Sequence, residues 1–257
     1  MSERPYFETS GLAAGYGGSP LIKDINIKLE RGRILTLIGP NGAGKSTVLK
    51  TITGQLPPVS GAVYIGGRRT SDMSRKELAR TIAVLLTERV KTDMMTCRDV
   101  VETGRYPYTD SLGILSDEDR AAVERTMEAS GITELADRDF MTLSDGQKQR
   151  VMLARAEAQE SDILVLDEPT SYLDIRYQLE LLDTLRRLSE ERGTTVIMSL
   201  HELFLAERIS DLIICIKDQK IDNIGTPAQI FSGTYIDSLY DLAPGTYSSL
   251  RKAPGNY

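Results

Sequence analysis

A nine-residue segment between two apolar stretches constrains this chain more than any other feature. It reads Gly39-Pro40-Asn41-Gly42-Ala43-Gly44-Lys45-Ser46-Thr47. It fits the pattern G-x-x-x-x-G-K-[ST], with a predicted strand over 34–38 before it and a predicted helix over 48–52 after it. In this pattern glycines let backbone N–H groups surround a phosphate, Lys45 contacts the β- and γ-phosphates, and Ser46 offers a hydroxyl to Mg²⁺. The alternative is a chance glycine-rich turn, and the order of strand, loop and helix argues against it.

The overall composition limits the class of protein. Apolar residues make up 40% of the 257 and charged residues 26%, which is ordinary for a globular protein. The net charge of −6 argues against a general binder of nucleic acid or of an anionic membrane surface. With one histidine and two distant cysteines, a His/Cys metal site and a disulfide framework are disfavoured. The longest aliphatic run covers only 212–216, so we expect a cytoplasmic protein that reaches a membrane only by docking to another protein.

The pattern of apolar residues indicates an α/β fold. Ile25, Ile27 and Leu29 alternate with polar residues, which predicts antiparallel strands near the N-terminus. The continuous apolar run 163–166 is typical of a strand buried on both faces, and a predicted helix and a further strand follow it. Alternating strands and helices of this kind predict a parallel sheet with right-handed crossovers.

The middle of the chain is predicted to be helical. Helix starts are indicated at Thr96, Ser116 and Ser144, and no convincing strand lies between them. We therefore predict a phosphate-loop NTPase core with an inserted helical subdomain. The predicted boundaries are 1–86 and 161–257 for the nucleotide-binding α/β core and 87–160 for the subdomain.

Two further segments allow only coarse interpretations. Tyr106 and Tyr108 lie in a predicted loop of the subdomain, as packing residues or as anchors of a protein contact. The C-terminal tail is rich in Gly, Ser, Tyr and Pro, and we expect one short helix after Pro227.

Acidic residues and the one histidine follow two predicted core strands. Asp167 and Glu168 come directly after the buried run 163–166, and His201 follows the strand over 195–199. Ligands of open α/β sheets bind at the carboxyl ends of the strands, so these side chains are expected to face the phosphate loop. Asp167 suits Mg²⁺, Glu168 suits orientation or deprotonation of an attacking water, and His201 can donate to a γ-phosphate. The alternatives are an acidic turn and a surface histidine.

A second candidate anion site lies in the helical subdomain. Ser144, Asp145, Gly146 and Gln147 form a helix start in which Ser144 and Gln147 can make a capping box. The N–H groups and positive dipole of a helix start attract anions. We expect this start to meet a phosphate held by a second copy of the chain, which predicts a head-to-tail dimer around two ATP molecules.

Taken together, these motifs resemble those of the ATP-binding subunits of ABC transporters, in the same order over residues 7–225. The resemblance implies an adenine-stacking role for Tyr16, which otherwise reads as a turn tyrosine. It identifies Ser144–Gln147 as the signature sequence, Asp174 as part of the dimer-contacting loop, Glu168 as the catalytic glutamate and His201 as the switch histidine. Residues 100–108 are similar to those of importers of iron–siderophores, haem and vitamin B12.

The chain departs from the family pattern at three places. The usual glutamine after the strand at 82–86 is replaced by Thr87-Glu88, so Thr87 is a candidate Mg²⁺ ligand in its place. Asp145 replaces the commoner glycine of the signature. Glu157 stands where the helix usually carries leucine, so it must find a partner or solvent, or else this helix is more exposed than usual.

The resemblance implies an ATPase of a transport system. Its expected cofactors are ATP and Mg²⁺. Its expected partners are a second ATPase subunit, a transmembrane permease docked at the helical subdomain and, indirectly, an extracellular substrate-binding protein, with no nucleic acid. The expected location is the cytoplasmic face of the cell membrane. The alternative is a non-transport ABC ATPase that acts as a nucleotide-switched interaction module.

Overall fold

The computed structural model describes residues 5–85, 94–110, 112–171 and 173–252, in two compact units. The first unit comprises the residues up to Thr70 together with those from Ile197 onward, and the second comprises Ser71–Val196. The boundary falls inside strand β9 (Thr195–Ser199), which therefore contributes residues to both units. No helix among the described residues is long and apolar enough to cross a membrane.

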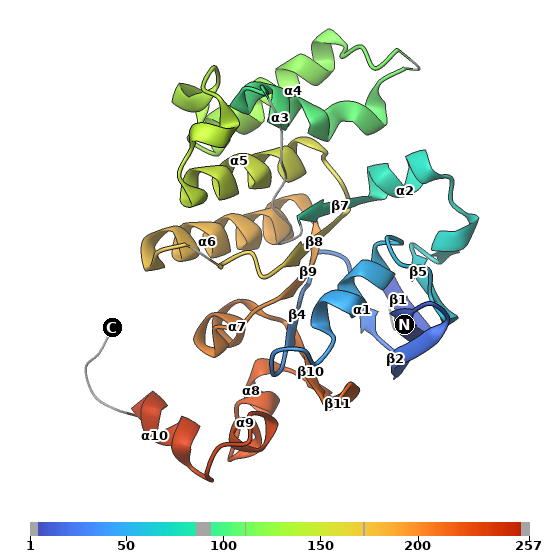
Figure 1. Ribbon diagram of the computed structural model, residues 1–257, viewed down its shortest axis with the longest axis vertical. Helices are drawn as coiled ribbons and strands as arrows, with labels where there is room; N and C mark the ends of the chain where they lie inside the picture. The colour runs from blue at the N-terminus through green and yellow to red at the C-terminus, as the bar shows by residue number, and fades with distance from the viewer. Residues whose placement is uncertain (1–4, 86–93, 111, 172, 253–257) are drawn as a thin grey trace. The chain divides into compact units, whose positions relative to one another are not determined.

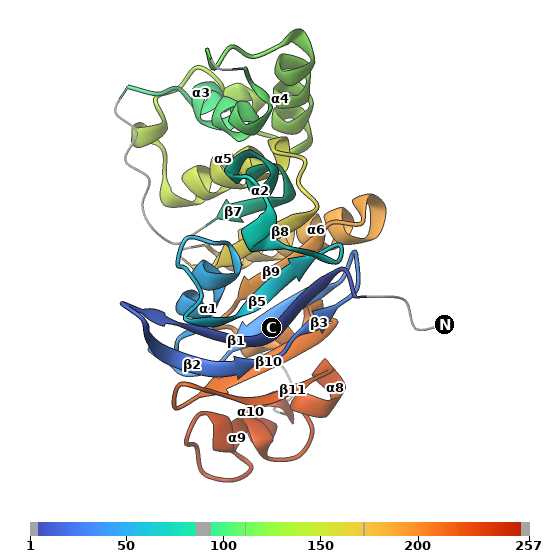
Figure 2. The ribbon, with the colours of Figure 1, turned by 90° about the vertical axis from the view of Figure 1, so that its right-hand side faces the viewer.

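An antiparallel sheet forms the N-terminal part of the first unit (Figure 2). Its strands are β1 (Phe7–Tyr16), β2 (Ser19–Ile25), β3 (Lys28–Leu29), β5 (Ser60–Ile65) and β6 (Arg68–Arg69). Their order is β2-β1-β5-β6, with β3 beside β1. Ile25, Ile27 and Leu29 are buried and the residues between them are exposed, which confirms the predicted alternation.

The rest of the first unit is a second group of strands with flanking helices (Figure 1). The strands run in the order β11-β10-β4-β9, with β4 (Ile34–Ile38) parallel to β10 (Leu212–Lys217) and β11 (Lys220–Gly225) antiparallel to β10. Every residue of β4 is buried, as expected for a strand covered on both faces. The helices here are α1 (Lys45–Ile52) and α7 (Leu203–Ile209).

The C-terminal segment contains three helices, so the expectation of one short helix was incomplete. They are α8 (Pro227–Ile230), α9 (Tyr235–Leu239) and α10 (Thr246–Lys252). The buried Asp237 carboxylate accepts hydrogen bonds from the backbone N–H groups of Gly245 and Tyr247, at 2.8 and 2.7 Å, and so fixes the turn between α9 and α10. Helices this short owe their stability to such tertiary contacts rather than to local sequence pattern.

The first boundary falls inside η1 (Thr70–Asp72), and the second unit continues with α2 (Arg75–Thr81) and β7 (Ile82–Leu85). Strand β7 pairs in parallel with β8 (Ile163–Asp167), in the order β9-β8-β7, and α6 (Ile175–Arg192) follows β8. The remaining helices are α3 (Cys97–Glu102), η2 (Thr103–Tyr108), α4 (Asp117–Ala129), η3 (Thr133–Leu135), η4 (Phe140–Thr142) and α5 (Asp145–Ala158). The subdomain predicted over 87–160 lies within this unit, and its boundaries stay a prediction.

Capping boxes start the main helices of this region at the predicted residues. Thr96, Ser116 and Ser144 each accept a hydrogen bond from the backbone three residues on, and each backbone N–H donates back to the side chain there. Behind these starts, apolar side chains of α3, α4 and α5 form one buried cluster that includes Val101, Met127 and Val151. Local capping and a shared apolar core therefore both stabilise the helices in this part of the chain.

The segment predicted as a loop around the two tyrosines is the 3-10 helix η2. Arg105 holds it in place, because its buried guanidinium donates to Asp119 at 2.9 Å and to Glu160 at 2.8 Å. The Tyr108 hydroxyl donates to the carbonyl of Gln159 at 2.8 Å, whereas Tyr106 is 57% exposed. Tyr108 is thus a packing residue, and Tyr106 is available to a partner.

Candidate functional site

The phosphate loop is shaped by glycines whose conformations other residues rarely adopt. Gly39 and Gly44 have φ values of +147° and +107°. A Cβ on Gly39 would lie 2.0 Å from the carbonyl oxygen of Ile216, and one on Gly44 would lie 2.7 Å from the Ile22 side chain. Both glycines are therefore needed for the loop to close onto its own unit.

The start of α1 has no side-chain cap, and the ammonium group of Lys45 lies beside it. The N-cap residue Gly44 makes no side-chain cap, so no side chain at that position takes up the N–H groups of the first turn. Lys45 is only 5% exposed, and its ammonium donates to the carbonyls of Gly39 at 2.8 Å and Pro40 at 3.2 Å. A helix start with a lysine held across it is suited to bind phosphate.

Tyr16 lies beside this loop. The structure places it at the end of β1, paired with Ser19, rather than in the turn, which Gly17 and Gly18 form. Its hydroxyl lies 3.2 Å from the Thr47 hydroxyl, and the side chain is 56% exposed. An exposed ring fixed next to the first turn of α1 is placed to stack on a nucleotide base, and that role stays a prediction.

A residue that the sequence did not single out, Tyr240, also contacts the loop. Its hydroxyl accepts a hydrogen bond from the backbone N–H of Gly39 at 3.1 Å. Burial raises the pKa of Tyr240 to about 12, so the hydroxyl stays neutral at physiological pH. No local motif marks this tyrosine, because the contact joins positions 201 residues apart.

His201 completes the candidate residues of the first unit. The backbone N–H of Leu200 donates to the carbonyl of Leu37 at 3.2 Å, so the end of β9 lies against the end of β4. His201 is half-buried and directly follows this bond. The histidine is therefore held at the strand end that leads into the phosphate loop.

The acidic pair lies in the second unit, at the end of β8. Asp167 is the last residue of the strand and is buried. Glu168 has a φ of +50°, in the left-handed region that residues with a side chain seldom occupy. The backbone N–H of Ser171 donates to the Glu168 carbonyl at 3.1 Å and closes a turn after the strand. Backbone strain of this kind often marks a functional position.

The start of α5 is closed by its own side chains. The Ser144 hydroxyl accepts from the Gln147 N–H at 3.3 Å, and the Gln147 side chain accepts from the Ser144 N–H at 3.1 Å. A Cβ on Gly146 would lie 3.8 Å from Leu173, which precedes α6. Asp174 caps α6 by accepting from the Tyr177 N–H at 3.0 Å. The signature residues and the predicted dimer loop are therefore neighbours within this unit.

Glu157, the unexpected acid of α5, is buried. Its exposure is 5%, so the alternative of a more exposed helix is wrong. Burial raises the pKa of its carboxyl, while the charges of Arg187 and Arg192 act in the opposite direction. Thr87 and Glu88, the other departure from the family pattern, lie outside the described residues.

Comparisons with known proteins agree with these motifs. A protein-family profile described as ABC transporter matches residues 22–171. An ABC transporter ATP-binding protein of Methanocaldococcus jannaschii is 42% identical over 95% of this chain and 84% of its own length. The iron(3+)-hydroxamate import ATP-binding protein of Bacillus subtilis is 39% identical over 91% of this chain and 87% of its own. A dimeric ATP-binding cassette, solved in a post-hydrolysis state bound to ADP and Pi, is similar with a TM-score of 0.76 and 26% identity, covering 86% of this chain and 98% of its own.

Proposed function

This chain belongs to the ABC transporter family and is an ATPase, and we propose that it is the ATP-hydrolysing subunit of an importer. In this proposal two copies dimerise around two ATP·Mg²⁺ and drive a separate permease. The phosphate loop carries the proposal, because Lys45 is held across an uncapped helix start at the end of a buried strand. A loop of this kind is suited to bind the phosphates of a nucleotide.

Each of the candidate side chains has a proposed role in the chemistry. Residues 39–47 bind the phosphates, with Lys45 neutralising the charge that develops on the γ-phosphate. The hydroxyl of Ser46 and the carboxylate of Asp167 are oxygen donors that would hold Mg²⁺, and the ion would supply positive charge to stabilise the phosphates. Glu168 orients or deprotonates the attacking water, and His201 donates to the γ-phosphate.

Glu168→Gln tests this assignment. The variant should bind ATP with unchanged affinity, because it keeps the loop, and should lose turnover by about 10²–10⁴-fold, the usual contribution of a general base. It should also accumulate as a dimer in ATP, which size-exclusion chromatography detects. Asp162→Asn, six residues earlier in the chain, is the matched control and should keep turnover. Normal turnover in Glu168→Gln would remove Glu168 from this role.

The start of α5 is proposed to complete the site of the other copy. This helix start is exposed or half-buried, so a phosphate can approach it. It consists of Ser144, Asp145, Gly146 and Gln147. Asp174 caps the neighbouring helix and would lie in the same dimer contact. The dimeric cassette that resembles this chain supports a pairing of this kind.

The permease is proposed to dock at a groove in the second unit. A cavity of about 770 Å³ has an apolar floor that includes Met95 and Met152, and Arg75, Lys76 and Tyr106 also line it. Tyr106 is exposed, and aromatic and cationic side chains around an apolar floor are typical of protein contacts. This docking would hold the ATPase at the cytoplasmic face of the membrane.

The transported substrate is proposed to be an iron–siderophore, haem or cobalamin, delivered by an extracellular binding protein. The support is the relative named for iron(3+)-hydroxamate import. The test is to co-purify the permease, measure ATP turnover with and without it, and measure uptake of each substrate class in vesicles. If no co-purifying membrane protein changes the rate of ATP turnover, the result would instead favour a non-transport ATPase.

A further inference from the structure

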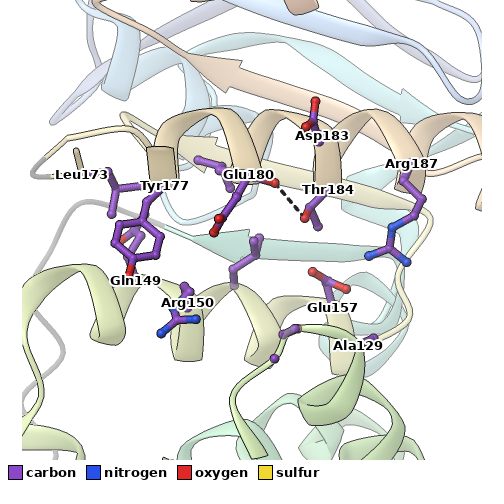
Figure 3. A pocket seen from close by; sticks show the side chains of 14 residues that line it. Ala129, Gln149, Arg150, Glu157, Leu173, Tyr177, Glu180, Asp183, Thr184 and Arg187 are labelled. Carbon is purple, nitrogen blue, oxygen red and sulfur yellow. Dashed lines mark hydrogen bonds between the residues drawn. The ribbon is translucent and has the colours of Figure 1, made fainter. Parts of the chain in front are cut away.

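A cavity of about 540 Å³ opens between α5 and α6, away from the groove proposed for the permease (Figure 3). Arg150, Leu153 and Glu157 of α5 line one side, and Tyr177, Leu181 and Arg187 of α6 line the other. Ser130, just after α4, closes one part of the wall. A volume of this size suits a small ligand.

Polar groups without partners gather in this cavity. Within the described part of the chain, two buried side-chain atoms lack any hydrogen bond, Ser130 Oγ and Arg150 Nε, and both residues line it. Glu157 as a residue is 5% exposed, and its carboxylate makes no hydrogen bond or ion pair with a described residue. Buried polar groups are nearly always paired, so two unpaired atoms lining one cavity, with a largely buried carboxylate beside them, point to a missing partner.

Figure 3 shows how the charged groups lie. The Glu157 carboxylate points toward α6, and the Arg187 guanidinium faces it from there without reaching ion-pair distance. The Arg150 guanidinium lies over the Tyr177 ring, 5.3 Å from its centroid. Glu180 is already paired with Arg176 at 2.9 Å, so Glu157 is the acid that remains available at depth.

The cavity has two polar ends and an apolar middle. Arg150 and Glu157 are seven residues apart on α5, which separates them by about 10 Å along the same helix face. Leu153 lies between them, and Leu181 faces the cavity from α6. A matching ligand would carry opposite charges at the two ends of an apolar body of similar length.

We propose that this cavity binds a small elongated zwitterion, with its ammonium group at Glu157 and its carboxylate at the Nε–H of Arg150. The chain of the ligand lies over Leu153 and Leu181. Arg187 compensates part of the Glu157 charge when the cavity is empty, so it competes with the ammonium group. Two arginines and three acids line the cavity, and one of these acids, Glu180, is paired with Arg176. The remaining charges balance, which favours a ligand without net charge.

The test uses ω-aminooctanoate, whose charged ends span about the required distance, and titrates it calorimetrically into the full chain without nucleotide. We expect saturable binding that is about tenfold or more weaker for octanoate, octylamine and the short γ-aminobutyrate, since each loses a charged contact. Octanedioate is also titrated, because it carries a carboxylate at each end. It would bind more tightly than ω-aminooctanoate if both ends of the cavity bound carboxylates, and that result would also overturn the proposal. Absence of saturable binding by ω-aminooctanoate, or equal affinity for these probes, would overturn the proposal.

Variants that are expected to change the affinity for ω-aminooctanoate in opposite directions sharpen the test. Glu157→Gln should weaken binding of ω-aminooctanoate about tenfold, and Glu157→Leu should abolish it while the protein remains folded, because leucine suits a buried position. Arg187→Gln should tighten binding, since it removes the competitor. Glu191→Gln, an exposed acid of α6 outside the cavity, is the control and should change nothing. Unchanged binding in Glu157→Gln would refute the proposal. None of these measurements needs ATP, so they stand apart from the proposed importer function.

Discussion

The chain contains two helix starts that are proposed to bind phosphate, and they are built in opposite ways. Helix α1 begins after Gly44 with no side-chain cap, and Lys45 is held across its first turn by loop carbonyls. Helix α5 begins after Ser144 with a complete capping box. One start offers its N–H groups to a ligand, whereas side chains of the other satisfy part of its backbone.

We propose that this difference separates a helix start that binds phosphate without a second chain from one that contributes only within a dimer. The glycine conformations of the α1 loop are fixed by contacts such as that of Gly39 with Ile216, so the loop is preorganised for phosphate. At α5 a phosphate must share or replace the hydrogen bonds of Ser144 and Gln147, and part of its binding energy is lost in doing so. We therefore expect tight nucleotide binding at α1 and a contribution of α5 that depends on the dimer.

The largest expected effect comes from a matched pair of glycine substitutions. Gly44→Ala forces a left-handed residue and an overlap with Ile22, which should cost about 2–5 kcal/mol and abolish ATP binding. Gly146→Ala has room for the new Cβ, so thermal unfolding should stay near that of the natural chain. Calorimetric ATP titration and thermal unfolding of both variants measure this. Equal losses of ATP affinity and thermal stability in the two variants would contradict the proposed difference between the two helix starts.

Lys45→Ala tests the cation at α1. Loss of its charged hydrogen bonds to phosphate should weaken ATP binding by about 1.5–3 kcal/mol, or roughly 10–150-fold. Lys50→Ala, in the last turn of the same helix, is the control and should keep the dissociation constant. An unchanged constant in Lys45→Ala would argue against the phosphate-loop assignment.

Glu157 provides a pH test at the other end of α5. Because burial raises its pKa in the folded state, the folded chain binds the proton more tightly than the unfolded chain. Stability from this group is therefore greatest below the ordinary glutamate pKa and falls as the pH rises toward the raised pKa, with Arg187 and Arg192 reducing the effect. Glu157→Leu should raise the free energy of unfolding by about 1–3 kcal/mol at neutral pH. This gain in stability should shrink in acid, where the carboxyl of the natural chain is protonated. A constant difference across pH, measured by urea unfolding, would contradict this.

Ser144→Ala addresses the capped start directly. Loss of the cap should cost about 0.5–2 kcal/mol of stability without changing the ATP affinity of a single chain, while turnover of the dimer falls. Ser116→Ala removes the equivalent capping box of α4 and should cost similar stability but no turnover. If turnover falls alike in both variants, helix stability rather than phosphate contact explains the role of Ser144.

The smallest expected effect concerns the support of the α1 loop. Tyr240→Phe removes the acceptor of the Gly39 N–H and should weaken ATP binding by about 0.5–1.5 kcal/mol, or roughly 2–10-fold. Tyr247→Phe is the control, because its hydroxyl makes no hydrogen bond with a described residue, and it should keep the ATP affinity. Equal affinities in the two variants would show that the contact does not support the loop.

Much of this architecture could be predicted because its signals are local. Capping boxes need residues only three positions apart, so the starts at Thr96, Ser116 and Ser144 were predicted correctly. The phosphate loop is a continuous segment with fixed glycine positions. The family resemblance followed from the order of such segments and is confirmed by the comparisons.

The features that could not be predicted depend on distant contacts. The burial of Glu157 results from α6 lying against α5, and the contact of Tyr240 joins the C-terminal segment to Gly39. Helices α9 and α10 are stabilised by the buried Asp237 rather than by their own sequence. The roles of Asp167, Glu168 and His201 remain predictions from their positions in the sequence.

The left-handed backbone of Glu168 has a consequence for protein engineering. A residue with a Cβ in this conformation costs about 1–2 kcal/mol of backbone strain relative to glycine. Glycine at position 168 would remove this strain, and it would also remove the carboxylate that we propose acts on the attacking water. If Glu168 has the proposed role, a thermostability screen that recovers glycine at position 168 recovers an inactive variant, so such a screen needs an activity filter.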